Sequence, residues 1–153
     1  MSDIVDRRNL DFVLYEMLGL EALLATPRYS AHDRASVSAM FDVAEALATE
    51  HFLPIAALLD TREPAFVDGR VEIPEEARQA LAAFAEAGLF AAGFDEEVGG
   101  LQLPWIVATN LNGMFTAANL ALANYPFLTT AAANMLNAFG SEEQKAQFLG
   151  PML

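Results

Sequence analysis

The two histidines are the first side chains to consider for chemistry, because a neutral imidazole can bind a metal ion or accept a proton near neutral pH. His32 precedes Asp33, and His51 follows Glu50. A di-iron or di-manganese site in a helical bundle needs Glu-x-x-His pairs, and neither histidine has an acidic residue three positions before it. We therefore expect His32 and Asp33 to lie at the start of a helix and His51 to pack on one, with no metal bound at either.

Other catalytic arrangements lack their local signatures. No serine stands in a Gly-x-Ser-x-Gly elbow, and the glycines of VGGLQLP, residues 98–104, lack the spacing of a phosphate-binding loop. Paired carboxylates occur at Glu75-Glu76, Glu96-Glu97 and Glu142-Glu143, where helix dipoles or solvent stabilise them. The sequence therefore predicts no catalytic residue and no self-contained active site in this chain.

Composition excludes several further classes. Because there is no cysteine, disulfides and cysteine-ligated zinc or iron–sulfur sites are excluded, and we expect a reducing, cytoplasmic location. The 21 acidic residues against 8 basic ones disfavour binding to the phosphates of nucleic acid. The longest apolar run, Phe52 to Leu59, is shorter than the roughly 20 residues that a membrane span needs. We expect neither a nucleic-acid partner nor a membrane span.

Helical spacing dominates the first part of the chain. In residues 9–25 the apolar side chains recur every three or four positions, and Gly19 divides the segment into two short helices. A second helix is predicted to begin at Asp33, which acts as its N-cap, and to bend at Pro54.

The middle of the chain contains a break in this helical pattern. An Asp68-Gly69 pair between short β-prone runs predicts a small hairpin near residues 66–73. Pro74 then starts another helix at its first position, and a loop follows from Gly88 to Pro104.

Two long helices and a short one complete the chain. The first is predicted over residues 104–124, ending at Tyr125-Pro126 because proline restricts the residue before it. The second covers residues 127–139 and closes at Gly140 as a C′ glycine, and a capping box over residues 141–144 opens the last helix. The prediction is an all-α fold, an orthogonal or up-and-down bundle of about six helices.

The distribution of charge is uneven. From Val98 to Ser141, 44 consecutive residues contain none of the charged side chains. Six asparagines and Pro126 in this run oppose a membrane segment, because buried amides need hydrogen-bond partners. Two interpretations stay open: a helix pair buried inside this domain, or a pair with one face meant for another domain, a second subunit, or a cofactor with its substrate.

Several segments resemble one protein family. The order EEVGGLQLP, a long uncharged helix, YPFLTTAA and FGSEEQKAQFLGPML resembles the N-terminal α-helical domain of acyl-CoA dehydrogenases. Residues 1–32 resemble the short N-terminal extension of a subgroup that includes 3-(methylthio)propanoyl-CoA dehydrogenase-like enzymes, and residues 33–153 then form the domain itself. The ending at GPML, after a newly capped helix, suggests a piece of a longer polypeptide whose middle and C-terminal domains lie outside this chain.

The resemblance implies a function for the full-length protein. Such enzymes remove two hydrogens across Cα–Cβ of an acyl-CoA thioester, in fatty-acid or related acyl catabolism, and pass a hydride to FAD. Their flavin motifs and catalytic glutamate lie in the later domains, so we expect this chain alone to be inactive and to bind FAD weakly at most. The family also implies a homodimer or homotetramer.

The resemblance also suggests a substrate pocket. The end of the first long helix and the start of the next help to line the acyl-chain pocket in the family, which corresponds here to Asn124, Tyr125, Phe127, Leu128 and Ala131. The bulk of Phe127 would shorten such a pocket. For these five residues, the alternative stays open that they only pack the bundle. For the chain as a whole, the alternative stays open that it is a stand-alone interaction or dimerisation module without catalysis.

Overall fold

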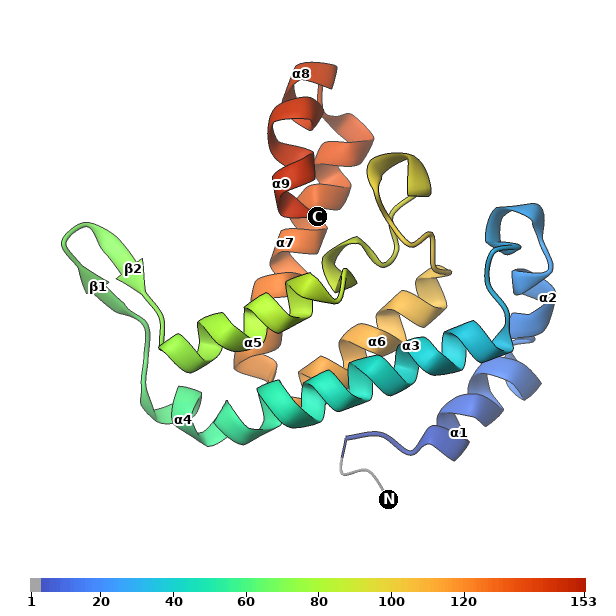
Figure 1. Ribbon diagram of the computed structural model, residues 1–153, viewed down its shortest axis with the longest axis horizontal. Coiled ribbons are helices and arrows are strands. Elements are labelled where there is room, and N and C mark those ends of the chain that lie inside the picture. The colour runs from blue at the N-terminus through green and yellow to red at the C-terminus, as the bar shows by residue number, and fades with distance from the viewer. Residues whose placement is uncertain (1–3) are drawn as a thin grey trace.

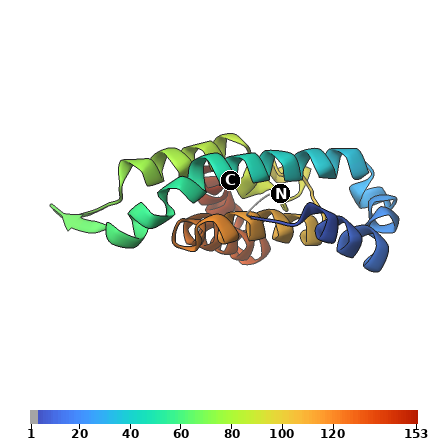
Figure 2. The ribbon, with the colours of Figure 1, turned by 90° about the horizontal axis from the view of Figure 1, so that it is seen from below.

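The computed structural model of the chain describes residues 4–153, which form helices and one short hairpin. In Figure 1, α3 (Arg34–Leu47), α5 (Glu75–Glu86) and α6 (Trp105–Ala118) run roughly along the long axis, and α3 contacts α6. From the end of α6, α7 (Leu120–Phe139) leads away from these helices and carries the C-terminal turns. Seen from below, the layer formed by the long helices is thin (Figure 2). The expected all-α fold is confirmed.

The remaining helical segments are short. Before α3 lie α1 (Arg7–Asp11), a π-helical continuation (Phe12–Met17), α2 (Leu20–Leu24) and a 3-10 turn (Pro27–Tyr29). After α3 come a π-helical turn (Ala48–Phe52), a 3-10 turn (Leu53–Ile55) and α4 (Ala56–Thr61). Two 3-10 turns separate α5 from α6 (Leu89–Ala91 and Glu96–Val98). Beyond α7 lie α8 (Glu142–Gln144), a π-helical turn (Lys145–Leu149) and α9 (Gly150–Met152).

The predicted start of α3 is confirmed by its hydrogen bonds. Asp33 Oδ1 accepts from the backbone N–H of Ser36 at 2.7 Å, and the Asp33 N–H donates to Ser36 Oγ at 2.9 Å. These two bonds satisfy backbone donors that the first turn of a helix leaves free. Gly19 also divides the N-terminal helices as predicted, because it adopts a left-handed conformation with φ of 63°. Pro54 lies where the long helix changes to a 3-10 turn, which confirms the expected bend.

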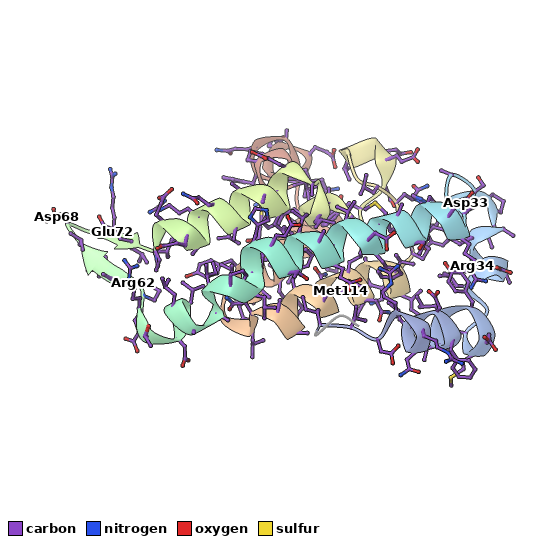
Figure 3. The ribbon with its side chains drawn as sticks, turned by 60° about the horizontal axis from the view of Figure 1, so that its bottom comes forward. Asp33, Arg34, Arg62, Asp68, Glu72 and Met114 are labelled. Carbon is purple, nitrogen blue, oxygen red and sulfur yellow. The ribbon has the colours of Figure 1, made fainter. Side chains whose placement is uncertain are left out.

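The predicted hairpin is present and projects from one end of the molecule. β1 (Ala65–Val67) pairs antiparallel with β2 (Arg70–Glu72), with Phe66 opposite Val71. Both turn residues, Asp68 and Gly69, have positive φ, as a two-residue type I′ turn requires. Asp68 at this tip and Asp33 at the start of α3 lie at opposite ends of the protein, with Met114 between them (Figure 3).

The predicted boundary between the two long helices is wrong. The break lies at Asn119, where φ is −161°, and Tyr125 and Pro126 continue inside α7. Asn119 is buried: its Oδ1 accepts from the Leu122 N–H at 3.1 Å, and its Nδ2 donates to the Phe52 carbonyl at 3.1 Å. Because this side chain both caps α7 and satisfies a distant carbonyl, it determines the break. The buried ring of Pro126 packs within the protein, which offsets part of the cost of proline inside a helix.

Two smaller predictions at helix ends are corrected. Pro74 precedes α5 as its N-cap residue and is not its first helical residue. Gly140 ends α7 as predicted, but with φ of −69° it is not the left-handed C′ glycine expected. Glycine is required there for space, because a Cβ atom would lie 2.6 Å from the Leu136 carbonyl oxygen. The chain then runs extended into Ser141, whose capping box with Gln144 is confirmed.

Three buried phenylalanines join the long helices, and we call Phe52, Phe84 and Phe115 the aromatic core. Each is at most 1% exposed. The Phe115 ring centroid lies 4.8 Å from those of Phe52 and Phe84, with the rings edge to face. Such geometry adds to the stabilisation from burial, which is about 1.5–3 kcal/mol for each side chain. The aromatic core therefore fixes the α3 continuation, α5 and α6 relative to one another.

Candidate functional site

A groove of about 240 Å³ lies between α6, α7 and the segment that precedes α6. The order of the chain places these elements together, because the turn at Asn119 sends α7 back past the segment between α5 and α6 (Figure 1). One wall comes from the segment itself, with Leu89, Phe90, Ala92, Gly93 and Phe94. The other walls come from the two helices, with Trp105, Ala108, Thr109, Asn112, Phe127, Thr130, Ala131 and Asn134.

The two helices contribute to the groove with the same spacing. Residues 105, 108, 109 and 112 of α6 and residues 127, 130, 131 and 134 of α7 each follow the pattern i, i+3, i+4, i+7, which places them on one helical face. The uncharged sequence of both helices therefore faces the groove from two sides.

The groove has no charged side chain among its lining residues. Its polar groups are two threonines and two asparagines, and Asn134 already donates to the Thr130 carbonyl at 3.0 Å, within α7. Such a lining can bury apolar parts of a ligand and offer a few hydrogen bonds. None of its lining side chains is a carboxylate or a cation that could act as a general base or pair with a phosphate.

The structure distributes the five predicted site residues over different environments. Phe127 and Ala131 line the groove. Tyr125 lines a separate hollow of about 150 Å³ beside the base of the hairpin, formed with Arg62, Pro74 and others. Asn124 and Leu128 are exposed on α7. The helix therefore carries all five side chains but does not bring them into one pocket.

A row of exposed apolar side chains follows α7, and we call it the uncharged ridge. Its five large members are each at least 60% exposed: Leu120, Phe127, Leu128, Met135 and Phe139. No helix in residues 4–153 has both the length and the apolar character needed to cross a membrane. This ridge opposes the interpretation that the uncharged helices are buried within this domain alone, since large contiguous apolar patches mark contact sites.

Sequence reasoning missed the α6 side of the groove. Trp105 is 70% exposed although tryptophan has the largest apolar side chain. It precedes Thr109 by one helical turn and Asn112 by two. An aromatic residue followed at helical spacing by small polar residues, inside an uncharged run, was a signal for a ligand-facing surface. The wall from Leu89 to Phe94 carried no such signal, because its position depends on the folding of the following loop.

The two histidines lie in positions typical of residues that support the fold. His32 Nε2 lies 2.7 Å from the Leu101 carbonyl oxygen, so this nitrogen carries the proton and donates. His51 lies in the π-helical turn that follows α3, as the expected packing on a helix requires. Within the described residues no three metal-binding side chains of the His, Cys, Asp and Glu types gather at one place.

Comparison with known proteins gives these features a context. The model of the family described as "Acyl-CoA dehydrogenase, N-terminal domain" matches residues 35–153, which include every residue of the groove. The chain is 27% identical over 143 residues to a 3-methylmercaptopropionyl-CoA dehydrogenase of Ruegeria pomeroyi. It is 30% identical over 145 residues to a broad-specificity linear acyl-CoA dehydrogenase, FadE5, of Mycobacterium tuberculosis.

The extent of these matches differs between the chain and its relatives. Each match covers 90% of this chain but only 24% and 23% of the two relatives, so the chain spans about a quarter of their length. Residues 35–153 make up less than 90% of the chain, so each match with a relative also includes part of the segment before α3. The chain belongs to the acyl-CoA dehydrogenase family and contains the family's N-terminal domain.

Proposed function

We propose that this chain is the N-terminal part of a flavin-dependent acyl-CoA dehydrogenase and that its groove holds part of the acyl chain of the substrate. The proposal rests on one observation: a domain of this family contains an uncharged groove next to the exposed side chains of the uncharged ridge. Residues 1–32 would form the extension and residues 33–153 the helical domain. A stand-alone dimerisation module is not favoured, because the relatives are enzymes of which this domain is one part.

The size of the groove supports a partial site. Complete small-molecule sites occupy about 300–1,000 Å³, whereas this groove measures about 240 Å³. The groove does not fit FAD, because its lining has no cationic side chain to pair with a pyrophosphate. We therefore place the FAD site and the catalytic carboxylate in the part of the protein outside this chain. When bound there, FAD would supply the hydride acceptor for the reaction.

The chain's own residues would bind and orient the acyl group. Phe127 and Ala131 contact it in the proposal because they line the groove, and each methylene that they remove from water would contribute about 0.8 kcal/mol. Asn124, Tyr125 and Leu128 would reach the acyl chain only if another domain closed over the exposed side of α7. We also propose that the full-length protein is cytoplasmic, which the cysteine-free sequence supports. We propose in addition that it forms a homodimer or homotetramer, which the exposed side chains of the uncharged ridge support.

Turnover of acyl-CoA thioesters should distinguish the 153-residue chain from the full-length protein. We expect the full-length gene product with FAD to oxidise at least one member of a series of linear acyl-CoA thioesters, measured with an artificial electron acceptor. The 153-residue chain with FAD should show no turnover. Absence of activity from the full-length protein, or turnover by the chain alone, would contradict the proposal.

The position of Phe127 predicts an effect on substrate length. Phe127→Ala in the full-length protein should raise kcat/KM for longer acyl-CoA thioesters relative to shorter ones, because the ring no longer fills the groove. We expect a shift of about 10-fold, as one or two buried methylenes allow. Leu120→Ala is the matched control, since it removes an exposed apolar side chain of the same helix that lies outside the groove. An equal shift in both variants, or none in Phe127→Ala, would show that Phe127 does not contact the acyl chain.

A further inference from the structure

The wall of the groove before α6 is one limb of a doubled loop. The outgoing limb, residues 89–94, lines the groove, and the returning limb, residues 100–103, lies behind it. Three backbone bonds join the limbs: Leu101 N–H to Ala91 O at 3.2 Å, Leu103 N–H to Ala92 O at 2.9 Å, and Gln102 N–H to Phe94 O at 2.8 Å. Because of these bonds, a displacement of the returning limb would also move the groove wall.

The returning limb has an unusual backbone conformation. Gln102 has φ of 51°, which residues with a side chain rarely adopt, and a Cβ at Gly100 would lie 2.1 Å from the Phe94 carbonyl oxygen. Such a limb needs contacts from elsewhere in the protein to stay in place.

The segment just before α3 supplies those contacts, and we call them the clasp. His32 Nε2 donates to the Leu101 carbonyl at 2.7 Å, and Gln102 Nε2 donates to the Arg28 carbonyl at 2.7 Å. The Arg28 guanidinium also forms an ion pair with Asp95, at the turn between the limbs. These bonds join residues separated by about 70 positions in the sequence. No clasp residue lines the groove, so any effect on a ligand must pass through the loop.

We propose that Arg28 and His32 are positioning residues for the groove: by holding the returning limb, they fix the wall at residues 89–94 in its ligand-binding position. The proposal rests on the proposed function of the groove. A wall that is ordered beforehand avoids the entropy cost of ordering it when the acyl group binds. Loss of the clasp therefore weakens binding and raises KM, while kcat changes little, because the reacting atoms lie outside this chain.

Position 32 allows a matched set of variants in the full-length protein. His32→Leu removes the donor and keeps a side chain of similar size, whereas His32→Gln keeps an N–H group able to reach the Leu101 carbonyl. His51→Leu makes the same chemical change at the other histidine, which lies in the turn after α3 and outside the clasp. We expect His32→Leu to raise KM for the best linear acyl-CoA about 5-fold, consistent with the loss of one hydrogen bond. His32→Gln and His51→Leu should stay within twofold of the unaltered protein.

Hydrogen exchange provides a readout that does not depend on turnover. The amides of Leu101, Gln102 and Leu103 donate the bonds between the limbs, so their exchange reports whether the wall is held. We expect their exchange to be about 10-fold faster in His32→Leu and unchanged in His32→Gln and His51→Leu.

The measurements of KM and of hydrogen exchange distinguish the ways in which the proposal could fail. Unchanged exchange in His32→Leu would overturn the clasp, whatever the turnover. Faster exchange with an unchanged KM would show that the clasp holds the loop but does not position the groove, and would overturn the proposal. If the unaltered full-length protein oxidises no acyl-CoA, the proposed function fails, and the exchange rates alone then decide whether His32 holds the wall.

Discussion

The aromatic core and the uncharged ridge show opposite relations between apolar side chains and their surroundings. Phe52, Phe84 and Phe115 are at most 1% exposed and contact one another, whereas the five ridge residues on α7 are each at least 60% exposed. The same chain therefore completes one apolar surface by itself and leaves the other open. The difference indicates that α3, α5 and α6 form a self-sufficient scaffold together with the buried face of α7 and the segment before α3, and that the outer face of α7 presents a contact surface.

Truncation of the aromatic core should have the largest effect. Phe115→Ala leaves a cavity between Phe52 and Phe84, and we expect it to lower the free energy of unfolding by about 3–5 kcal/mol. The same substitution at Phe127 on the ridge should cost the 153-residue chain less than about 1 kcal/mol, because that ring is already 60% exposed. Urea denaturation of both variants measures the contrast. Equal losses would remove the distinction between the two regions.

Asn119 joins the two regions and should have the next largest effect. Asn119→Ala removes the cap of α7 and leaves the buried Phe52 carbonyl without this partner, so we expect a loss of about 2–3 kcal/mol. Asn124→Ala, on the exposed face of α7, is the matched control and should change stability by less than about 0.5 kcal/mol. Urea denaturation measures both variants, and a small effect at Asn119 would mean that α7 packs without its cap.

These two asparagines also show which parts of the fold could be predicted. The starts of α3 and α8 and the hairpin turn were predicted because their signals are local: Asp33 with Ser36, Ser141 with Gln144, and Asp68-Gly69. The boundary at Asn119 was missed because its side chain bonds Phe52, which is 67 residues away. The proline at position 126 favoured a boundary after Asn124 instead.

The candidate site divides in the same way. All five residues were chosen through a family resemblance and a helix boundary that the structure moves; Phe127 and Ala131 line the groove, whereas Asn124, Tyr125 and Leu128 do not. The opposite wall depends on hydrogen bonds between distant segments, such as His32 with Leu101. Sequence spacing identifies residues that share a helical face, but it does not show which loop folds over that face.

The ridge itself can be tested by comparing the chain with the full-length protein. Phe139 is 85% exposed, so Phe139→Ser should alter the stability of the chain by less than about 0.5 kcal/mol. If another domain or subunit covers the ridge, the same change should destabilise the full-length protein by about 2 kcal/mol, as lost burial of a phenylalanine predicts. Thermal unfolding measures both proteins. Equal and small effects in both would show that the ridge end stays exposed to water.

The smallest expected effects concern acid sensitivity at the starts of α3 and α8. The Ser36 backbone N–H holds the pKa of the Asp33 carboxyl below its ordinary value of 3.8, and the Ser141 hydroxyl likewise lowers the pKa of Glu143. For a lowered pKa, the stabilisation is fully present above the unfolded-state value and is lost as the pH falls through the folded-state value. Both contributions should therefore be constant near neutral pH and decline as the pH falls below the ordinary carboxyl values, 3.8 for Asp33 and 4.5 for Glu143.

Neutral isosteres separate these two contributions. Asp33→Asn keeps a capping oxygen but cannot ionise, so its stability should converge with that of the unaltered chain as the pH falls below the ordinary aspartate value of 3.8. Glu143→Gln should converge as the pH falls below the ordinary value of 4.5 but from a smaller difference, since Glu143 accepts chiefly from the Ser141 hydroxyl and only secondarily from its own backbone N–H. Urea denaturation as the pH is lowered measures both variants. A larger difference for Glu143→Gln would show that the start of α8 contributes more to stability than the start of α3, which would contradict a self-sufficient scaffold centred on the aromatic core.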